Sequence, residues 1–155
     1  MAENTENYEN DFPCIVVDNS YLVSFLLGKY CENERSEAER VIRSVLERNG
    51  QLYVPQLFWF EVGNVLLNVA KKNKISGVPG ITEEQLCQIE GFLSELPIYT
   101  DLQPDAETRS RIGVYAREYD LSYYDASYLE LARRYNLKLY TFDADLKSAY
   151  EACIE

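Results

Sequence analysis

The residues best suited to chemistry in this sequence are four acids, Asp18, Glu61, Asp125 and Asp143. Asp18 ends one short apolar run, Asp143 follows another, and the other two acids lie within segments of helical pattern. The chain contains no histidine. Converging carboxylates without imidazole indicate a site for Mg²⁺ or Mn²⁺, because these hard cations prefer oxygen ligands. We therefore predict that all four acids serve as metal ligands and catalytic groups.

Carboxylates that hold metal ions are suited to breaking a phosphodiester bond. This reaction needs a water deprotonated near neutral pH and a means of neutralising the charge that develops on the phosphate. Two divalent ions about 3.5–4 Å apart do both, because they clamp the attacking and the leaving oxygen. Holding two such ions takes three or four carboxylates. Without the ions, these like charges in one cleft would repel one another and take up protons. The acids thus favour phosphodiester hydrolysis.

Each acid also has a structural explanation when it is considered alone. Asp18 and Asp143 each precede a helical pattern, and Asp is a preferred N-cap residue. Asp125 follows Ser122 at the spacing of a capping box. Glu61 lies among apolar neighbours, although glutamate is usually exposed. Only the combination of the four acids favours the catalytic interpretation.

Short apolar segments alternate with longer amphipathic segments along the chain. We predict strands over 14–18, 51–54, 98–100 and 138–142. Helices are predicted over 20–27, 36–48, 56–73, 82–95, 106–119, 123–135 and 144–152. This alternation is typical of an α/β domain with a mainly parallel sheet.

Helix start and stop signals support several of these segments. Capping-box patterns begin at Thr82 and at Ser36. Gly50 follows the second predicted helix, where a C-terminal glycine is common. The segment 77–80 contains two glycines and a proline, which predicts a turn between two long helices.

The predicted topology bears directly on the position of the acids. Ligands of open parallel sheets bind beyond the carboxyl ends of the strands, at the point where the strand order reverses. Asp18 and Asp143 follow the first and the last predicted strand. If these two strands are neighbours across the reversal, their carboxylates lie close together.

Composition limits the class of protein and the kind of partner. With 155 residues the chain has the size of one domain, which we place at 13–155 after an acidic, disordered leader over 1–12. The net charge of −11 argues against a strong non-specific nucleic-acid binder, which usually carries a basic face. No apolar stretch approaches the roughly 18 residues of a membrane span, and no signal peptide opens the chain, so we predict a cytoplasmic protein.

Four motifs, in order and at suitable spacing, resemble those of the PIN-domain ribonucleases, and most closely their VapC-type toxins. The matching segments are 16–20, 55–66, 121–132 and 139–146. The resemblance covers the chain from about Ile15 to the C-terminus and implies a three-layer α/β/α domain with a four- to five-stranded sheet.

The resemblance also implies an activity and partners. It assigns the four acids to the metal-binding site and implies Mg²⁺- or Mn²⁺-dependent endonucleolytic cleavage of RNA. It further implies a cognate antitoxin and a homodimer. The polar residues that would support the carboxylates are Ser20, Asn64 and Thr141, and Asp145 joins them at the start of the last helix.

Two groups of residues near the acids are candidates for contact with RNA. Lys71, Lys72 and Lys74 end the helical stripe that begins at Glu61, and we predict that they bind phosphates. Four tyrosines surround Asp125 in the sequence, and we favour packing in the core or a dimer interface over base stacking for them; they are Tyr119, Tyr123, Tyr124 and Tyr128.

Other functions fit the sequence less well. A phosphoacceptor receiver domain would have a lysine after the last strand, where this chain has Asp143. A dinucleotide-binding domain would show G-x-G-x-x-G after its first strand, which is missing here. A haloacid-dehalogenase-type phosphatase would have D-x-D-x-T in that position. The alternative that remains is a catalytically silent PIN-like scaffold that binds RNA or a protein.

Overall fold

The computed structural model describes residues 13–28, 32–76 and 80–154, except for the side chains of residues 72–76. The predicted leader over 1–12 and most of the predicted turn over 77–80 lie outside this part. Within it the chain forms four strands, β1 (Ile15–Val17), β2 (Leu52–Val54), β3 (Ile98–Thr100) and β4 (Lys138–Tyr140). The helices are α1 (Asn19–Leu27), α2 (Glu32–Glu47), α3 (Phe58–Ser76), α4 (Glu83–Glu95), α5 (Ala106–Glu118), α6 (Tyr123–Tyr135) and α7 (Ala144–Ile154).

The four strands form one parallel sheet in the order β3-β2-β1-β4. From β1 the chain adds β2 and then β3 on one side, and it returns to place β4 on the other side of β1. The strand order therefore reverses between β1 and β4. The first and the last strand are neighbours, which meets the condition stated from the sequence, so Asp18 and Asp143 follow adjacent strands.

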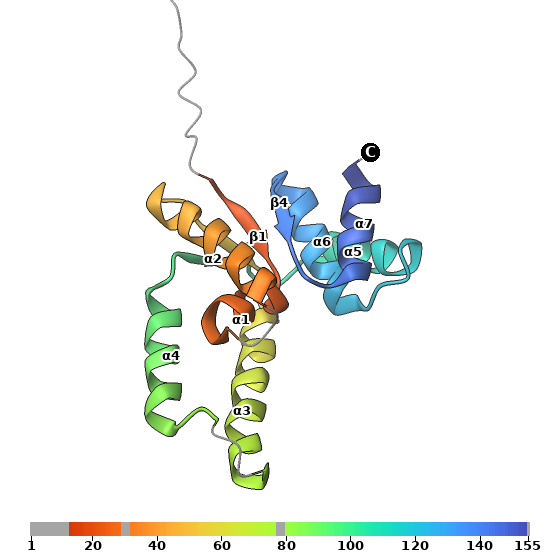
Figure 1. Cartoon of the computed structure of the whole chain (residues 1–155). Coiled ribbons are helices and arrows are strands. Elements are labelled where there is room, and N and C mark those ends of the chain that lie inside the picture. Colours follow the sequence, from red (N-terminus) through yellow and green to blue (C-terminus); the bar gives the residue numbers. More distant parts are fainter. Residues whose placement is uncertain (1–12, 29–31, 77–79, 155) are drawn as a thin grey trace, which may run out of the picture.

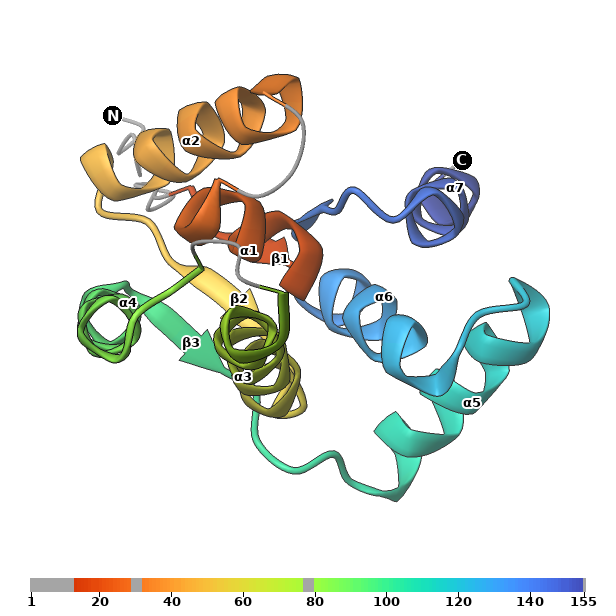
Figure 2. The same ribbon diagram turned by 60° about the horizontal axis from the view of Figure 1, so that its bottom comes forward.

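Helices cover both faces of this sheet, which confirms the predicted three-layer α/β/α fold. Helix α6 contacts β1, β2 and β4 and is backed by α5, while α7 lies beside β4 and α6. Helices α1 to α4 lie on the other side, where α1 contacts both α2 and α3 (Figures 1 and 2). None of the described helices combines the length and apolar character that crossing a membrane requires.

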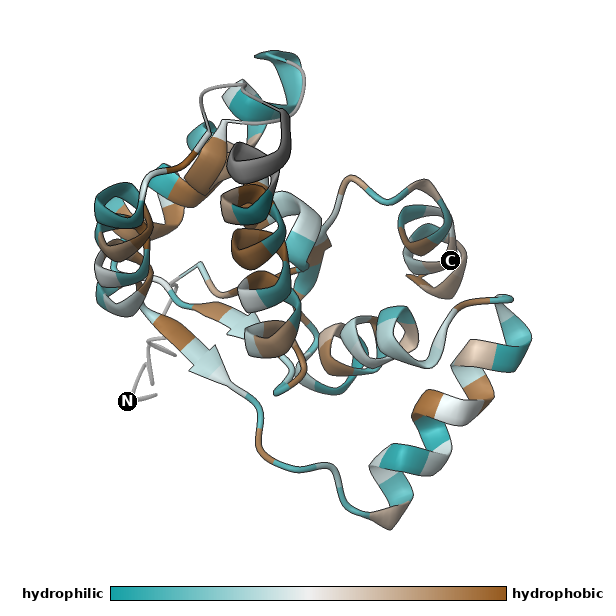
Figure 3. Ribbon diagram, turned by 90° about the horizontal axis from the view of Figure 1, so that it is seen from below, coloured by the Kyte–Doolittle hydropathy of each residue, from teal (hydrophilic) through white to brown (hydrophobic). Residues whose placement is uncertain are grey.

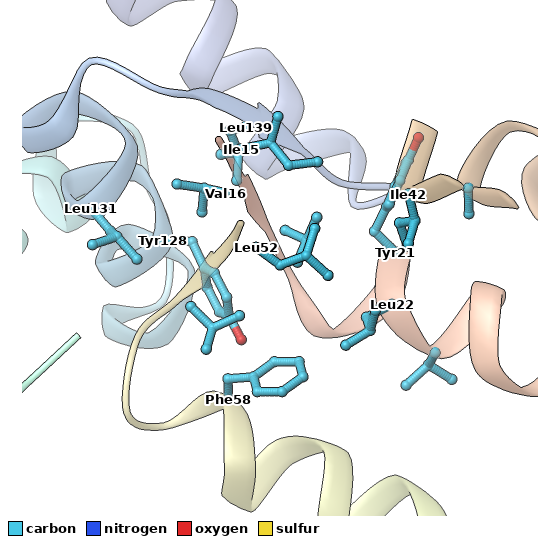
Figure 4. Packing of buried hydrophobic residues seen from close by; sticks show 14 of the residues in the cluster. Ile15, Val16, Tyr21, Leu22, Ile42, Leu52, Phe58, Tyr128, Leu131 and Leu139 are labelled. Carbon is cyan, nitrogen blue, oxygen red and sulfur yellow. The ribbon is translucent and has the colours of Figure 1, made fainter. Parts of the chain in front are cut away.

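The core lies between the sheet and these helices. Val16, Val17 and Leu52 are fully buried, and they meet large side chains from both helical layers, including Tyr21, Phe58 and Tyr128 (Figure 4). Apolar residues gather on the faces of the helices that point toward the sheet, and hydrophilic residues cover the opposite faces (Figure 3). This pattern fixes the helices against the sheet and so fixes the positions of the acids.

Three of the strands are shorter than predicted, and the difference matters for the site. We predicted 14–18, 51–54 and 138–142, whereas each observed strand has three residues. At the carboxyl ends of β1 and β4 the chain leaves the sheet before reaching Asp18 and Asp143. The two acids thus lie in strand-to-helix turns. Their side chains are therefore not bound to point alternately to the two faces of the sheet, as those of a strand are.

The predicted N-terminus of α2 is wrong, whereas that of α4 is confirmed. Thr82 and Gln85 form the complete capping box at α4. Ser36, in contrast, lies inside α2, which begins at Glu32. Two glutamates in the first turn favour the earlier start because they oppose the positive end of the helix dipole.

The C-terminus of α2 also differs from the prediction. Asn49, with φ 54°, adopts the left-handed conformation that we assigned to Gly50. The Gly50 N–H donates to the Val45 carbonyl at 2.8 Å and the Asn49 N–H to the Leu46 carbonyl at 3.2 Å, which is a Schellman motif. Gly50 is required for another reason, since a Cβ there would lie 2.1 Å from the Pro13 carbonyl oxygen.

A buried acid ties α6 to its neighbours. Glu130 is 1% exposed, and one of its oxygens accepts hydrogen bonds from Arg111 of α5 and from Arg134, each at 3.1 Å. Arg134 also pairs with Asp101, which follows β3, and Arg111 pairs with the exposed Glu107. These ion pairs hold the segment after β3 and the helix α5 against α6.

Candidate active site

Asp18 lies at the carboxyl end of β1, where the chain enters α1. Its backbone N–H donates to the Tyr140 carbonyl of β4 at 3.2 Å. Its carboxylate caps α1 by accepting a hydrogen bond from the Tyr21 N–H at 2.9 Å. Only 6% of the residue is exposed. The capping role is therefore present, and the carboxylate keeps further lone pairs for other partners.

Two hydroxyl groups connect the Asp18 carboxylate to the turn that carries Asp143. Ser20 Oγ donates to the two Asp18 oxygens at 2.8 and 2.9 Å, and Thr141 Oγ1 donates at 2.6 Å. The Phe142 N–H donates in turn to Ser20 Oγ at 3.1 Å, and the Asp143 N–H donates to Thr141 Oγ1 at 2.9 Å. Ser20 and Thr141 thus bridge the ends of two adjacent strands and fix the acids that follow them.

Asp143 is the most exposed of the four acids and caps α7. Its Oδ1 accepts a hydrogen bond from the Leu146 N–H at 2.8 Å. The structural role considered for Asp143 from the sequence is therefore also present. One carboxylate oxygen remains available toward solvent.

Glu61 lies in the first turn of α3 and is half-buried. Its Oε2 accepts a short hydrogen bond from the hydroxyl of Tyr128, which is 1% exposed. Tyr128 extends from α6 across the core toward Phe58, with its phenol oxygen at the far end (Figure 4). Because α6 and α3 lie far apart in the sequence, this bond sets the position of Glu61 relative to the acids of the sheet edge.

Asp125 lies in the first turn of α6 and forms a local pair with Ser122. The Asp125 N–H donates to Ser122 Oγ at 3.0 Å, so Ser122 caps the helix as predicted. Ser122 Oγ donates back to Asp125 Oδ2 at 2.6 Å. Asp125 is half-buried, and this pair limits the rotation of its side chain.

The electrostatics of the site show that the four acids lie within range of one another. Burial raises the pKa of Asp18 despite its hydrogen bonds, and the charge of Asp143 raises it further. Burial also raises the pKa of Glu61, and the charges of Asp125 and Asp18 add to this shift. The ion pairs between described residues include none of these acids. Among the described side chains, the site therefore concentrates negative charge that no ion pair compensates.

The donor chemistry suits a hard cation, although the side chains are not gathered around one point. In the described part of the chain, no three acidic, cysteine or histidine side chains are placed to hold one ion as they stand. Each acid is instead turned toward a donor of the protein, and mutual repulsion keeps the carboxylates apart. Asn19 Oδ1, next to Asp18, is buried without a hydrogen-bond partner among the described residues. A water carried by a bound ion would satisfy such an acceptor.

The other predicted site residues lie outside these hydrogen bonds. Asn64 and Asp145 are exposed, and no hydrogen bond between described residues joins either of them to the four acids. Lys71 is exposed on α3, about 15 Å along the helix axis from Glu61. The side chains of Lys72 and Lys74 are not among those described, so phosphate binding by the three lysines stays a prediction.

The hydrogen bond from Tyr128 to Glu61 was not predicted from the sequence, which led us to assign Tyr128 to packing together with its neighbours. The packing interpretation is correct as far as burial is concerned, but the phenol also donates to Glu61. A signal was present, since Tyr128 follows Asp125 by one helical turn and a buried tyrosine hydroxyl usually finds a partner. Tyr123 and Tyr124, in contrast, are exposed and do not pack in the core.

Tyr128→Phe is expected to weaken divalent-ion binding by about tenfold without unfolding the chain. Removal of a group that orients a metal ligand typically costs 10- to 100-fold in affinity, and the phenylalanine ring fills the same space. Titration calorimetry with Mn²⁺ measures the effect. Tyr150→Phe is the control, because it removes a hydroxyl that donates to the Leu137 carbonyl, away from the acids. Equal affinities of the two variants would contradict this role for Tyr128.

In the presence of a chelator, Asp18 and Glu61 are expected to favour folding increasingly as the pH falls from neutral toward the ordinary carboxyl pKa of about 4. Asp18 and Glu61 have folded-state pKa values above their unfolded values, so between these values the folded state binds more protons than the unfolded state. Acidification through this window therefore favours folding, and the advantage is lost as the pH rises. Urea unfolding at several pH values tests this sign. Asp18→Asn should flatten the dependence; an unchanged slope would contradict the assignment.

The fold and the sequence were compared with known proteins. The protein PAE2754 from Pyrobaculum aerophilum has a similar structure, with a TM-score of 0.58 and 19% identity over 93% of this chain and 94% of that chain. VapC20 from Mycobacterium tuberculosis, described as a sarcin-ricin loop cleaving toxin, gives a TM-score of 0.60 and 16% identity over 87% of this chain and 94% of its own. At these identities the likeness establishes the fold alone.

Sequence comparison establishes the family. No curated protein matches this chain. A model of the PIN domain, however, matches residues 15–152, which include all four acids and nearly all of the described sheet and helices. This chain therefore belongs to the PIN-domain family.

Proposed function

We propose that this chain is a divalent-metal-dependent endoribonuclease, the toxin of a VapBC-type toxin–antitoxin pair. The observation that carries the proposal is the buried carboxylate of Asp18. It lies where the strand order reverses, burial raises its pKa, and the one charge that acts on it is that of another acid, Asp143. Helix capping accounts for Asp18 and Asp143 one at a time but not for unpaired carboxylates close to one another, whose charge a divalent cation would neutralise.

Each of the four acids would have a defined part in this activity. Asp18, Glu61, Asp125 and Asp143 would hold Mg²⁺ or Mn²⁺, which would activate a water and neutralise charge on the phosphate. Neighbouring hydroxyl groups would keep the carboxylates oriented: those of Ser20 and Thr141 for Asp18, that of Tyr128 for Glu61 and that of Ser122 for Asp125. Such preorganisation lowers the cost of binding the ions and the substrate.

The proposed partners follow from the family and from the similar folds. VapC20 is a toxin that cleaves the sarcin-ricin loop, and its fold supports RNA as the substrate here. A cognate antitoxin would bind the chain and block the acids, and two copies of the chain would form a homodimer. We place this activity in the cytoplasm. Asn64, Asp145 and the lysines at 71, 72 and 74 are retained in the proposal as supporting or phosphate-binding groups.

Digestion of total bacterial RNA by purified, antitoxin-free protein tests the proposal. We expect discrete cuts in Mg²⁺ or Mn²⁺ that disappear with a chelator, with fragment ends mapped by sequencing. Cuts that persist in the chelator but disappear in Asp125→Asn would show a nuclease that needs no metal and would overturn the assignment, whereas cuts that survive both controls come from a contaminant. Absence of both cuts and Mn²⁺ binding would remove the metal site altogether.

A silent PIN-like scaffold is the alternative, and one observation favours it. The described acids are not gathered into a group that holds an ion as they stand. A scaffold of this kind would bind RNA or a protein partner without Mn²⁺ and without cleavage. Calorimetry with Mn²⁺ separates the two functions, because only the nuclease requires the ion.

A further inference from the structure

A pocket of about 220 Å³ lies beyond the carboxyl ends of β2 and β3, at the edge of the sheet where Asp18 and Asp143 follow β1 and β4. Its walls come from the residues that directly follow β2 and β3, from α5, and from the first turns of α6. The Asp101 N–H donates to the Val54 carbonyl at 2.8 Å, so the segments beyond β2 and β3 lie side by side. The chain then runs from β3 past the foot of α3 to α5, which lies along α6 (Figure 2). The pocket thus occupies a place where parallel sheets commonly bind ligands.

The rim of this pocket carries large apolar side chains that remain exposed. Leu102 is 80% exposed, Tyr124 63% and Tyr123 46%, and all three line the pocket. Most of the thirteen tyrosines in the chain are better covered, so exposure of two in succession is unusual here. Exposed aromatic planes at the mouth of a hollow are suited to stacking against another flat ring.

The floor of the pocket is rigid and its polar groups are already paired. Glu130 is fixed by Arg111 and Arg134, and Ser127 Oγ donates to the Tyr124 carbonyl at 2.6 Å. The side-chain amide of Gln56, at the mouth, differs from these groups because no hydrogen bond between described residues uses it. Gln56 therefore offers one donor and one acceptor face to a bound molecule.

Helix α6 forms a common wall between the pocket and the acids. Asp125 and Tyr128 face Glu61, whereas Tyr123, Ser127 and Glu130 line the pocket from the same helix. Tyr124 lines the pocket and is the immediate neighbour of Asp125. An RNA strand with one phosphate at the acids would thus bring the adjoining nucleotide to the pocket.

We infer that this pocket binds one unpaired base of the RNA, next to the phosphate that is cleaved. The inference rests on the proposed nuclease function and names the class of substrate, namely single-stranded or looped RNA. The volume lies below the roughly 300–1,000 Å³ of pockets for drug-sized ligands, which suits one flat ring system. Base recognition in RNA uses aromatic stacking and hydrogen bonds to exposed base edges, and Tyr124 and Gln56 supply both. An acidic chain of net charge −11 also has reason to rely on stacking more than on phosphate attraction.

Fluorescence anisotropy with labelled RNA tests the inference without relying on cleavage. The probes are ten-nucleotide homopolymers of A, U and C and a duplex of mixed sequence, measured on the full chain with a chelator present. We expect Tyr124→Ala to raise Kd for at least one single-stranded probe about tenfold, as loss of one base stack does. Tyr124→Phe, which keeps the aromatic plane, should stay within twofold of the parent chain. Gln56→Ala should reduce the differences in Kd among the homopolymers.

Phe92→Ala provides the matched control, since Phe92 is a 44%-exposed aromatic residue on α4, outside this pocket. Equal losses in Phe92→Ala and Tyr124→Ala, or no loss in Tyr124→Ala, would overturn the inference. A change of oligomeric mass in Tyr124→Ala by light scattering would also overturn it and mark the rim as an interface between copies.

The inference and the proposed nuclease function can fail separately. Metal-dependent cleavage, together with unchanged RNA binding by Tyr124→Ala, would leave the proposed nuclease intact. Tyr124-dependent binding without cleavage would support the pocket and remove the nuclease.

Discussion

Glu61→Gln and Asp125→Asn are each expected to lower metal-dependent RNA cleavage about a hundred- to a thousandfold. This is the range observed when one electrostatic stabiliser of a transition state is removed. The amide keeps the shape of the side chain and one acceptor oxygen, so Tyr128 and Ser122 retain a partner. The lost charge is what an ion would need. Cleavage rates on a quenched fluorescent RNA, at saturating Mn²⁺, measure the effect.

Folding of these variants should be unaffected or improved when no divalent ion is present. The reason is that the charge of Asp125 raises the pKa of Glu61, so either substitution removes one of two carboxylate charges that repel each other. Glu90→Gln on α4 is the control, because it removes a charge from an exposed position outside the acid cluster. Cleavage by Glu61→Gln at the rate of Glu90→Gln would show that the acids do not act together.

Glu130→Ala is expected to destabilise the fold by about 3–5 kcal/mol, the usual cost of breaking a buried ion pair from one side. Arg111 and Arg134 would each lose a buried carboxylate, and the side chain of Glu130 is only 2% exposed. For a domain of this length the loss corresponds to about 6–20 °C in the midpoint of thermal unfolding. Differential scanning calorimetry measures both quantities.

The structure offers a closely matched control for Glu130. Glu107 pairs with the same Arg111 at 2.8 Å, but its side chain is 82% exposed. Glu107→Ala should therefore change stability by less than about 1 kcal/mol. Similar losses for both variants would mean that burial is not what makes the Glu130 contacts important, and that the helix pair α5–α6 is held by its apolar contacts.

Much of this fold was predictable because its signals are local. Alternating apolar and amphipathic segments identified each strand and helix of the described residues. The rule for ligand sites in parallel sheets indicated where Asp18 and Asp143 would meet if their strands were neighbours. Element ends were less predictable where two signals compete. At α2 the acidic residues before Ser36 extend the helix backward, and at its other end Asn49 takes the conformation expected of Gly50.

The residues of the candidate site could be proposed from the sequence, but their contacts could not. The acids were found from their positions after strands and within motifs. The bond from Tyr128 to Glu61 joins residues 67 apart, and the pairing of Glu130 with Arg111 joins residues 19 apart. Such contacts depend on helix packing and on side-chain rotation, for which the sequence carries no periodic signal. The rotation of each acid toward its own donor was missed for the same reason.

Asp18 caps α1 and, in the proposed nuclease, would also hold an ion, which has a consequence for how the proposed activity could be lost. Asparagine caps helices as well as aspartate does, so the carboxamide would preserve the start of α1. Aspartate and asparagine codons differ by one nucleotide. A single transition in the gene would therefore separate the folded shape from the chemistry, and descendants that carry asparagine here should persist as binding proteins.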